Sequence, residues 1–439
     1  MALSLKESAA RISVTKFLKG FIFAGCLIIL EEDGTVLTFE GSQKICPLTV
    51  SITIHNPKFY WKVATEADLG FADAYIQGDF SFVDKDEGLL NLITIFIANK
   101  DVYSPASNVT STDLLKSLFS AIAWMSSAKY IYRHFTNRNT ITQARRNISR
   151  HYDLSNEMFS LFMDETMLYS CAIFKTENED LTVAQMRKIS VLIEKARVEK
   201  HHEVLEIGCG WGTLAIEVVR RTGCRYTGIT LSEEQLKFCQ QRVKEAGLED
   251  RITLLLCDYR EVQHVFKYDR IFACEMIEAV GHEYMEEFFR CCESMLATDG
   301  LFVLQFTSMA DDCYDEYIKS GGFIKEYIFP GGCLPSMSHV VTSMAAASRL
   351  CVEHIENIGP HYCQTLRYWR KSFLENQSKL LSLGFDEKFI RTWEYYFDYC
   401  AAGFKMRLLG NFQVVFSRKG NLAVFRDYHA STPSAYYCP

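Results

Sequence analysis

Strand-like and helix-like patterns alternate between residues 186 and 306, and this alternation limits the possible folds more than any other feature of the chain. Amphipathic stretches with helical spacing separate five short apolar runs, which are EVLEIG, RYTGITL, ITLLLCD, RIFACEMI and GLFVLQF. Buried strands that alternate with helices pair in parallel, with helices on both faces of the sheet. We therefore predict an α/β domain with a doubly wound, Rossmann-like sheet.

The 439 residues are enough for a second domain beside this one. Residues 1–110 have the pattern of a small α+β domain, including a β-hairpin expected around Asp33–Gly34. Residues 111–150 read as a basic helical linker, and residues 151–439 hold the α/β region, two helical stretches rich in aromatic residues and a last strand. The apolar stretch Gly20–Leu30 is too short to span a bilayer and lacks a cleavage pattern, so neither a membrane span nor a signal peptide is expected.

Charge and cysteine content narrow the class of protein. A net charge of −7 gives no general reason to expect nucleic acid as a partner. The 16 cysteines include no C-x-x-C pair, and many of them lie inside apolar runs. This pattern is typical of reduced, buried thiols in a cytoplasmic protein rather than of disulfides or of a structural metal site, and we expect no metal.

Three glycines, Gly208, Gly210 and Gly212, follow the first strand of the α/β region. Glycines at this point let backbone N–H groups approach a ligand, and several nucleotide cofactors use such a loop. NAD would favour G-x-G-x-x-G and an acid at the end of the next strand, which here ends without one. Glu206 instead precedes the first glycine, where a carboxylate can face an ammonium group. The loop therefore fits S-adenosylmethionine better than NAD, and glycines that only allow tight strand–helix packing are the alternative.

The other expected contacts of this cofactor follow the later strands of the sheet. With no acid at the second strand, the ribose hydroxyls would be bound by Thr230, Ser232 and Gln235. Asp258 and Tyr259 end the third strand and would bind adenine, the first as an acceptor for its amino group and the second as an aromatic wall. The remaining candidates in these stretches are Cys209, Trp211 and Leu231.

Seven motifs between residues 145 and 420 resemble those of cyclopropane-fatty-acyl-phospholipid synthase in order and spacing: HYDLSNEMFSLFMDETMLYSCAIF, VLEIGCGWG, GITLSEEQ, EMIEAVGHEYMEEFF, EYIFPGGCLPS, GPHYCQTLRYW and YCAAGF. The chain looks most like the plant type, without its flavin-oxidase-like extension, and residues 1–110 resemble the lipid-carrier-like domain of the long forms. The resemblance implies a class I S-adenosylmethionine-dependent methyltransferase with a helical lid over an acyl channel. It also implies methyl transfer to the cis double bond of an unsaturated phospholipid acyl chain, which closes to a cyclopropane ring.

In this family the base that removes the last proton is a bound bicarbonate ion. The resemblance places its ligands at Glu278 in EMIEAVG, Tyr362 in GPHY and Cys171 in YSC, the last beside the cofactor residues Tyr169 and Ser170.

Bacterial members carry a histidine where this chain has Gln305. Glutamine keeps an amide donor of similar reach but loses a titratable group, which puts the details of the base in question. Cys400, in YCAAGF, matches a cysteine long regarded as catalytic in the family. A thiolate would add to a carbocation, so we expect Cys400 to line the acyl pocket rather than to act as a nucleophile.

Two other functions stay open. Deprotonation at another carbon would give a methyl-branched or methylene product, and the departure at Gln305 makes a catalytically inactive lipid-binding protein conceivable. Seven Lys and Arg residues without an intervening carboxylate lie between residues 116 and 150, beside an apolar face. Such a helix can dock on an anionic membrane, so peripheral association with a phospholipid surface is expected, with a solvated face as the alternative. A homodimer is left open.

Overall fold

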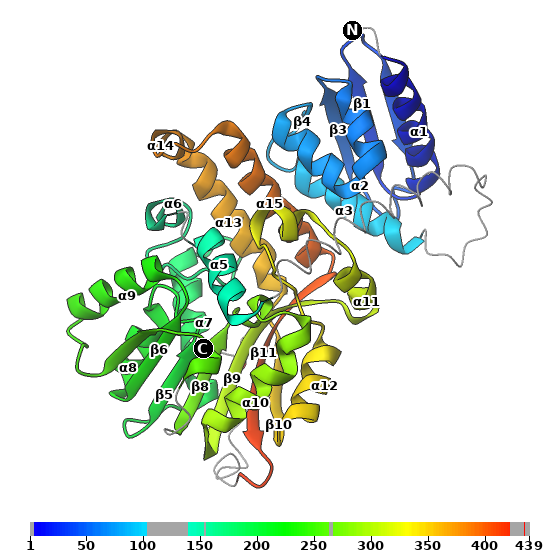
Figure 1. Ribbon diagram of the computed structural model, residues 1–439. Coiled ribbons are helices and arrows are strands. Elements are labelled where there is room, and N and C mark those ends of the chain that lie inside the picture. Colours follow the sequence, from blue (N-terminus) through cyan, green and yellow to red (C-terminus); the bar gives the residue numbers. More distant parts are fainter. Residues whose placement is uncertain (1–3, 103–138, 153–154, 263–266, 422–433, 435–439) are drawn as a thin grey trace. The chain divides into compact units, whose positions relative to one another are not determined.

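The computed structural model describes residues 4–102, 139–152, 155–262, 267–421 and 434 (Figure 1). Contacts divide the chain into two compact units, each described by itself. The first consists of the described residues of Met1–Phe135, Lys319–Ile328 and Phe373–Leu408, and the second of those of Thr136–Ile318, Phe329–Ser372 and Leu409–Pro439. None of the described helices is long and apolar enough to cross a membrane.

A four-stranded sheet with the order β2-β1-β3-β4 lies beside helices in the first unit (Figure 1). β1 and β2 pair antiparallel around Asp33–Gly34, which confirms the predicted hairpin, and the Thr35 N–H donates to Asp33 Oδ1 over 2.9 Å. β3 pairs with β1 in parallel and with β4 antiparallel. The elements are α1 (Leu5–Phe21), β1 (Cys26–Glu31), β2 (Val36–Glu40), β3 (Thr49–Ile54), α2 (Lys58–Gln77), β4 (Phe80–Phe82) and α3 (Gly88–Val102).

Helix α15 (Glu387–Lys405) belongs to the first unit, together with α14 (Gln377–Ser382) and the π-helix η4 (Ile324–Ile328). The sequence had placed this segment with the lid of the second domain. The difference has a physical cause, because the Tyr395 ring lies 6.4 Å from that of Phe71 and 5.7 Å from that of Tyr75. The Tyr75 hydroxyl also donates to Glu394 over 2.8 Å. Burial raises the pKa of Cys400, on the same helix, to about 12, and its place beside an acyl channel stays a prediction.

The predicted basic linker falls largely outside the described residues, which resume at residue 139. Its described part is α5 (Ile141–Tyr152), which belongs to the second unit. The docking surface expected over residues 116–150 is therefore not tested by the structure.

The second unit is built on a seven-stranded sheet with the order β10-β11-β9-β8-β5-β6-β7. β5 to β9 pair in parallel, as predicted for a doubly wound sheet, whereas β11 runs antiparallel to both of its neighbours. The sequence did not predict β10, an edge strand whose run LCVEHIEN mixes polar and apolar residues and is only partly buried. The strands are β5 (Glu203–Ile207), β6 (Arg225–Thr230), β7 (Ile252–Leu256), β8 (Tyr268–Cys274), β9 (Leu296–Met309), β10 (Leu350–Asn357) and β11 (Leu409–Arg418).

Helices cover both faces of this sheet, and successive residues of a strand point into opposite cores. Val204 packs in a cluster with residues of α7, α8 and α9, whereas Leu205 packs in a second cluster with residues of α10 and α12. The helical elements not yet named are α6 (Asn156–Ser160), α7 (Leu181–Ala196), α8 (Thr213–Thr222), α9 (Glu233–Glu245), η1 (Tyr259–Glu261), η2 (Ile277–Ala279), η3 (His282–Tyr284), α10 (Met285–Met295), α11 (Asp311–Lys319), α12 (Met337–Ala347) and α13 (Pro360–Glu375).

The strand order reverses between β5 and β8. From β5 the chain proceeds to β6 and β7 on one side, and from β8 it proceeds to β9 on the other. In a doubly wound sheet such a switch point opens a crevice at the carboxyl ends of the strands. Gly208 follows β5 and Glu275 follows β8, so both lie at this crevice.

Candidate active site

A cavity occupies the crevice, and thirteen of the fourteen predicted cofactor residues line it. They are Tyr169, Ser170, Glu206, Gly208, Cys209, Gly210, Trp211, Gly212, Thr230, Leu231, Gln235, Asp258 and Tyr259. Ser232 is the exception. Its hydroxyl accepts the N–H of Gln235 over 3.2 Å and caps α9, and its contact with the ribose stays a prediction.

Gly210 and Gly212 serve the loop in different ways. Both have a positive φ, +50° and +86° respectively, a backbone conformation that residues with a side chain rarely adopt. A Cβ added at Gly212 would lie 2.2 Å from the Cys239 sulfur, so this glycine is needed for packing on α9. A Cβ added at Gly210 would meet no described atom within 4 Å, because this glycine faces the cavity. Tight packing therefore explains the glycine at Gly212, whereas the glycine at Gly210 leaves room for a ligand to approach the backbone.

Glu206 is a buried carboxyl at the end of β5, with only 3% of its surface exposed. The Tyr226 hydroxyl donates to its Oε2 over 2.9 Å. Burial raises the pKa of Glu206 to about 7, against the lowering effects of the Tyr226 hydrogen bond and of Lys188. Lys188 also lines the cavity and donates to Ser170 Oγ over 2.6 Å. A cationic group of a ligand would therefore favour the charged form of Glu206.

Asp258 lies two residues after the end of β7, and the side chain of Arg260 holds its carboxylate. The guanidinium donates to Oδ1 and Oδ2 of Asp258, each over 2.8 Å, in a forked ion pair. Tyr259 packs edge-on against Phe288 at 5.3 Å, and among the described residues its buried hydroxyl has no hydrogen-bond partner. An adenine amino group at Asp258 would thus meet an acceptor whose orientation is already fixed.

Three of the residues expected at the bicarbonate site, Cys171, Gln305 and Tyr362, converge on a different carboxylate, that of Glu275. The Cys171 N–H donates to its Oε1 over 2.9 Å, and Gln305 Nε2 donates to the same oxygen over 2.8 Å. The Tyr362 hydroxyl donates to its Oε2 over 2.6 Å. Asn411 Nδ2 adds a fourth hydrogen bond, to Oε1, over 2.8 Å. Glu275 also lines the cofactor cavity.

Glu278, the expected bicarbonate ligand, lies one turn farther along in η2. Its Oε1 accepts the N–H of Thr307 over 2.5 Å. Its Oε2 is buried and has no hydrogen-bond partner among the described residues. Burial and the charge of Glu275 raise the pKa of Glu278 to about 8, so this carboxyl is mainly protonated at pH 7.

Cys171 contributes its backbone rather than its thiol. The side chain is fully buried, and its Sγ lies 3.3 Å from the carbonyl oxygen of Ala172. Burial and the charge of Glu275 raise the pKa of this thiol well above its ordinary value. The thiol therefore stays neutral and is no nucleophile.

A group of aromatic rings begins at Tyr362, whose hydroxyl donates to the Glu275 carboxylate. The Tyr362 ring lies 6.1 Å from that of Trp369, which in turn lies 5.1 Å from that of Tyr169. Phe162 packs against both Tyr169 and Trp369. These rings supply the electron-rich, water-poor surroundings that a cationic intermediate requires.

Four residues of the site were missed by the sequence analysis: Lys188, Arg260, Glu275 and Asn411. Lys188 had a usable signal, because it is a charged residue on the apolar face of a helix. Glu275 had a weaker one, since EMIEAVG contains two glutamates and only the second matches the family motif. Nothing in the sequence around Asn411 indicated a polar contact at the site.

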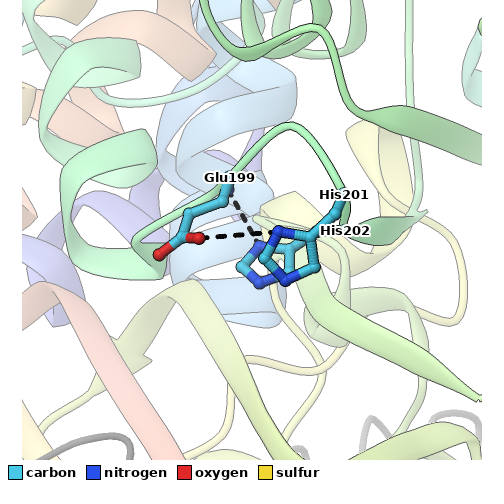
Figure 2. Close-up of side chains that lie close together, drawn as sticks. All are labelled: Glu199, His201 and His202. Carbon is cyan, nitrogen blue, oxygen red and sulfur yellow. Dashed lines mark hydrogen bonds and ion pairs between the residues drawn. The ribbon is translucent and has the colours of Figure 1, made fainter.

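Glu199, His201 and His202 lie close together in the loop before β5 (Figure 2). Their candidate ligand atoms lie within 4.8 Å of one another. His202 Nδ1 already accepts the N–H of Glu199 over 2.9 Å, which uses the acceptor nitrogen of a neutral imidazole. The loop is also at the amino end of β5, opposite the glycine loop. We assign no metal to this group, and the expected absence of a metal stays a prediction.

The two glycines provide a first test of the cofactor site. We predict that Gly212→Ala lowers the thermal midpoint strongly, because the new Cβ collides with Cys239. Gly210→Ala should cost only the left-handed backbone penalty of about 1–2 kcal/mol, yet weaken S-adenosylhomocysteine binding at least about tenfold because its methyl group enters the cavity. Thermal unfolding and isothermal calorimetry would measure both effects. Wild-type affinity in Gly210→Ala would contradict the assignment.

A second test uses the raised pKa of Glu206. We propose that this carboxylate faces the ammonium group of the cofactor, so binding should weaken as pH falls from 7.5 to 5.5 and Glu206 takes up a proton. Glu206→Gln should lose this pH dependence and bind about 10–100-fold more weakly, the equivalent of a charge-assisted hydrogen bond. Calorimetric titrations with S-adenosylhomocysteine at several pH values would show it. The same slope in both proteins would remove Glu206 from this role.

Comparisons with known proteins show the family to which the chain belongs. A family model described as mycolic acid cyclopropane synthetase matches residues 139–414. The tuberculostearic acid methyltransferase UfaA1 of Mycobacterium tuberculosis is 34% identical over 382 residues, which are 85% of this chain and 84% of that protein. The cyclopropane-fatty-acyl-phospholipid synthase of Escherichia coli K12 is 31% identical over 370 residues, 84% of this chain and 87% of that protein.

Solved structures give the same result. The cyclopropane synthase MmaA2 from Mycobacterium tuberculosis superposes with a TM-score of 0.58 at 26% identity, covering 62% of this chain and 98% of that one. The mycolic acid cyclopropane synthase CmaA1, solved with SAH and CTAB, has a TM-score of 0.58 at 29% identity and covers 63% and 98%. The chain therefore belongs to the mycolic acid cyclopropane synthetase family and is an S-adenosylmethionine-dependent C-methyltransferase.

Proposed function

We propose that this enzyme transfers the methyl group of S-adenosylmethionine to the cis double bond of an unsaturated acyl chain in a phospholipid and closes it to a cyclopropane ring. One observation carries the proposal. The cavity lined by Glu206 and the glycine loop is also lined by Glu275, a carboxylate held by four donors. Methylation of an alkene needs a proton acceptor beside the methyl donor, because the proton must leave from carbon after transfer.

The alkene is a poor nucleophile, so the site must align it with the methyl group and exclude stronger nucleophiles. The neutral thiol of Cys171 and the rings of Tyr169, Tyr362 and Trp369 meet this requirement. For the base, the family resemblance implies a bicarbonate ion. Its expected donors here surround Glu275 instead, so no step is assigned to bicarbonate.

Access to a bilayer substrate is part of the proposal. We expect the enzyme to dock peripherally on a phospholipid membrane through the basic residues of the 116–150 stretch, most of which lie outside the described residues. Of this stretch, Arg146 in α5 is exposed. Cytoplasmic location and a homodimer stay predictions of the sequence.

A second candidate product has support from a relative. One relative is named for tuberculostearic acid methylation and another for cyclopropane synthesis, at similar identities. A methyl-branched or methylene product from the same site is therefore the alternative. The complete cofactor cavity weighs against an inactive lipid-binding protein.

The product can be identified by isotope labelling. We predict that the full chain, incubated with oleoyl-phosphatidylcholine vesicles and methyl-deuterated S-adenosylmethionine, yields an acyl chain that retains two of the three deuterium atoms and resists hydrogenation under conditions that reduce alkenes. Mass spectrometry of the fatty acid methyl esters would show this, with the exposed-site variant Glu249→Gln as a matched control of unchanged activity. Retention of all three deuterium atoms would indicate a methyl-branched chain, and an unlabelled lipid would exclude the proposal.

A further inference from the structure

Three residues expected at the bicarbonate site already bind a carboxylate of this chain. Cys171 N–H, Gln305 Nε2 and the Tyr362 hydroxyl each donate to the carboxylate of Glu275, at 2.9, 2.8 and 2.6 Å. A carboxylate and a bicarbonate ion present the same planar pair of anionic oxygens to hydrogen-bond donors. The Glu275 side chain thus has the contacts expected of the free anion.

The backbone holds Glu275 in this position at a cost. Its φ is +49°, a strained conformation that non-glycine residues rarely adopt. The Glu275 N–H donates to the carbonyl oxygen of Gln305 over 2.7 Å, so the residue is tied to the end of β9 by main chain as well as by side chain. Strained residues that persist are those which their surroundings over-determine, and they cluster at active sites.

A buried chain of hydrogen bonds fixes the orientation of the Gln305 amide. Lys195 Nζ, which can only donate, donates to Gln413 Oε1 over 2.7 Å and to Glu356 over 2.6 Å. Gln413 Nε2 must then be the donor to Gln305 Oε1, at 2.9 Å. This leaves Gln305 Nε2 to donate to Glu275, at 2.8 Å. Glutamine at position 305 therefore suits a fixed carboxylate and needs no titratable group.

A second anion would be disfavoured at this place. A bicarbonate ion sharing the same donors would lie beside the Glu275 carboxylate, and like charges at that distance repel strongly in a buried site. The neighbouring Glu278 shows the effect, because the charge of Glu275 contributes to raising its pKa to about 8. The residues present do not fit bicarbonate.

We propose that the Glu275 carboxylate is itself the catalytic base and takes the place of bicarbonate in the reaction proposed above, on which this inference rests. When the methyl carbon bonds to one alkene carbon, its bond to sulfur breaks and the other alkene carbon becomes cationic. A C–H bond of the new methyl group then breaks. Its electron pair closes the ring onto the cationic carbon, and its proton passes to Glu275.

The two oxygens of Glu275 are not equivalent in this step. From the described residues Oε1 accepts three hydrogen bonds, whereas Oε2 accepts one, from Tyr362. Oε2 therefore keeps the lone pair that can receive the proton. The donors on Oε1 stabilise the charged form, which weakens the carboxylate both as a nucleophile and as a base, and they fix its orientation. A weak base is enough here, because a carbocation gives up a proton readily. Gln305, Asn411 and Tyr362 act as positioning residues.

The decisive experiment measures methylated lipid and S-adenosylhomocysteine with the full chain and oleoyl-phosphatidylcholine vesicles, in carbon-dioxide-free buffer with and without added bicarbonate. We expect wild-type turnover to be the same in both buffers. Glu275→Gln should lower turnover by about 10²–10⁴-fold, the usual contribution of a general base, while S-adenosylhomocysteine affinity stays within about threefold. Glu249→Gln, an exposed site, serves as the matched control.

A second variant separates loss of the base from loss of the fold. Glu275→Gly removes the carboxylate, accepts the positive φ and frees the donors of Cys171, Gln305 and Tyr362, so added bicarbonate should restore part of its turnover in a saturable manner. Wild-type turnover that depends on bicarbonate, or near-wild-type turnover of Glu275→Gln, would overturn this inference while leaving the proposed function intact. No methylated lipid from the wild type would overturn both.

Discussion

The carboxylate of Glu275 is the point at which distant segments of the second unit meet. Its four donors come from the segment before α7, from β9, from α13 and from β11. Hydrogen bonds to a charged group contribute about 1.5–3 kcal/mol each, and a donor left without its acceptor in a buried site is costly. The negative charge therefore holds the ends of two strands and one helix around the cavity, and it maintains a backbone conformation that glutamate would not otherwise adopt.

Burial favours the protonated form of two carboxyl groups, those of Glu206 and Glu278. The pKa values of Glu206 and Glu278 are raised to about 7 and about 8. Between the ordinary value of 4.5 and these values the folded chain binds more protons than the unfolded chain, so these two groups make the fold less stable as pH rises through that window. A cationic group of the cofactor, as proposed for Glu206, would offset this cost. Glu278 is mainly protonated at neutral pH.

The sequence was sufficient where function depends on local pattern. The apolar runs predicted the five parallel strands, and thirteen of the residues expected at the cofactor line one cavity, although their contacts with a cofactor stay a prediction. The sequence was insufficient where contacts between residues far apart in the chain decide the structure. Motif matching selects Glu278, but the main-chain bond from Glu275 to Gln305 and the amide of Asn411, 136 residues away, decide which carboxylate is held. Likewise, α15 joins the first unit through Phe71 and Tyr75, which lie more than 300 residues earlier in the chain.

In the proposed reaction the side-chain carboxylate of Glu275 occupies the place expected for a free anion. The most direct measurement is a crystal structure of the full chain with S-adenosylhomocysteine, grown in buffer that contains bicarbonate. The account predicts continuous side-chain density from Glu275 to the donors of Cys171, Gln305 and Tyr362. A separate planar anion on those three donors, with the Glu275 side chain turned away, would contradict it.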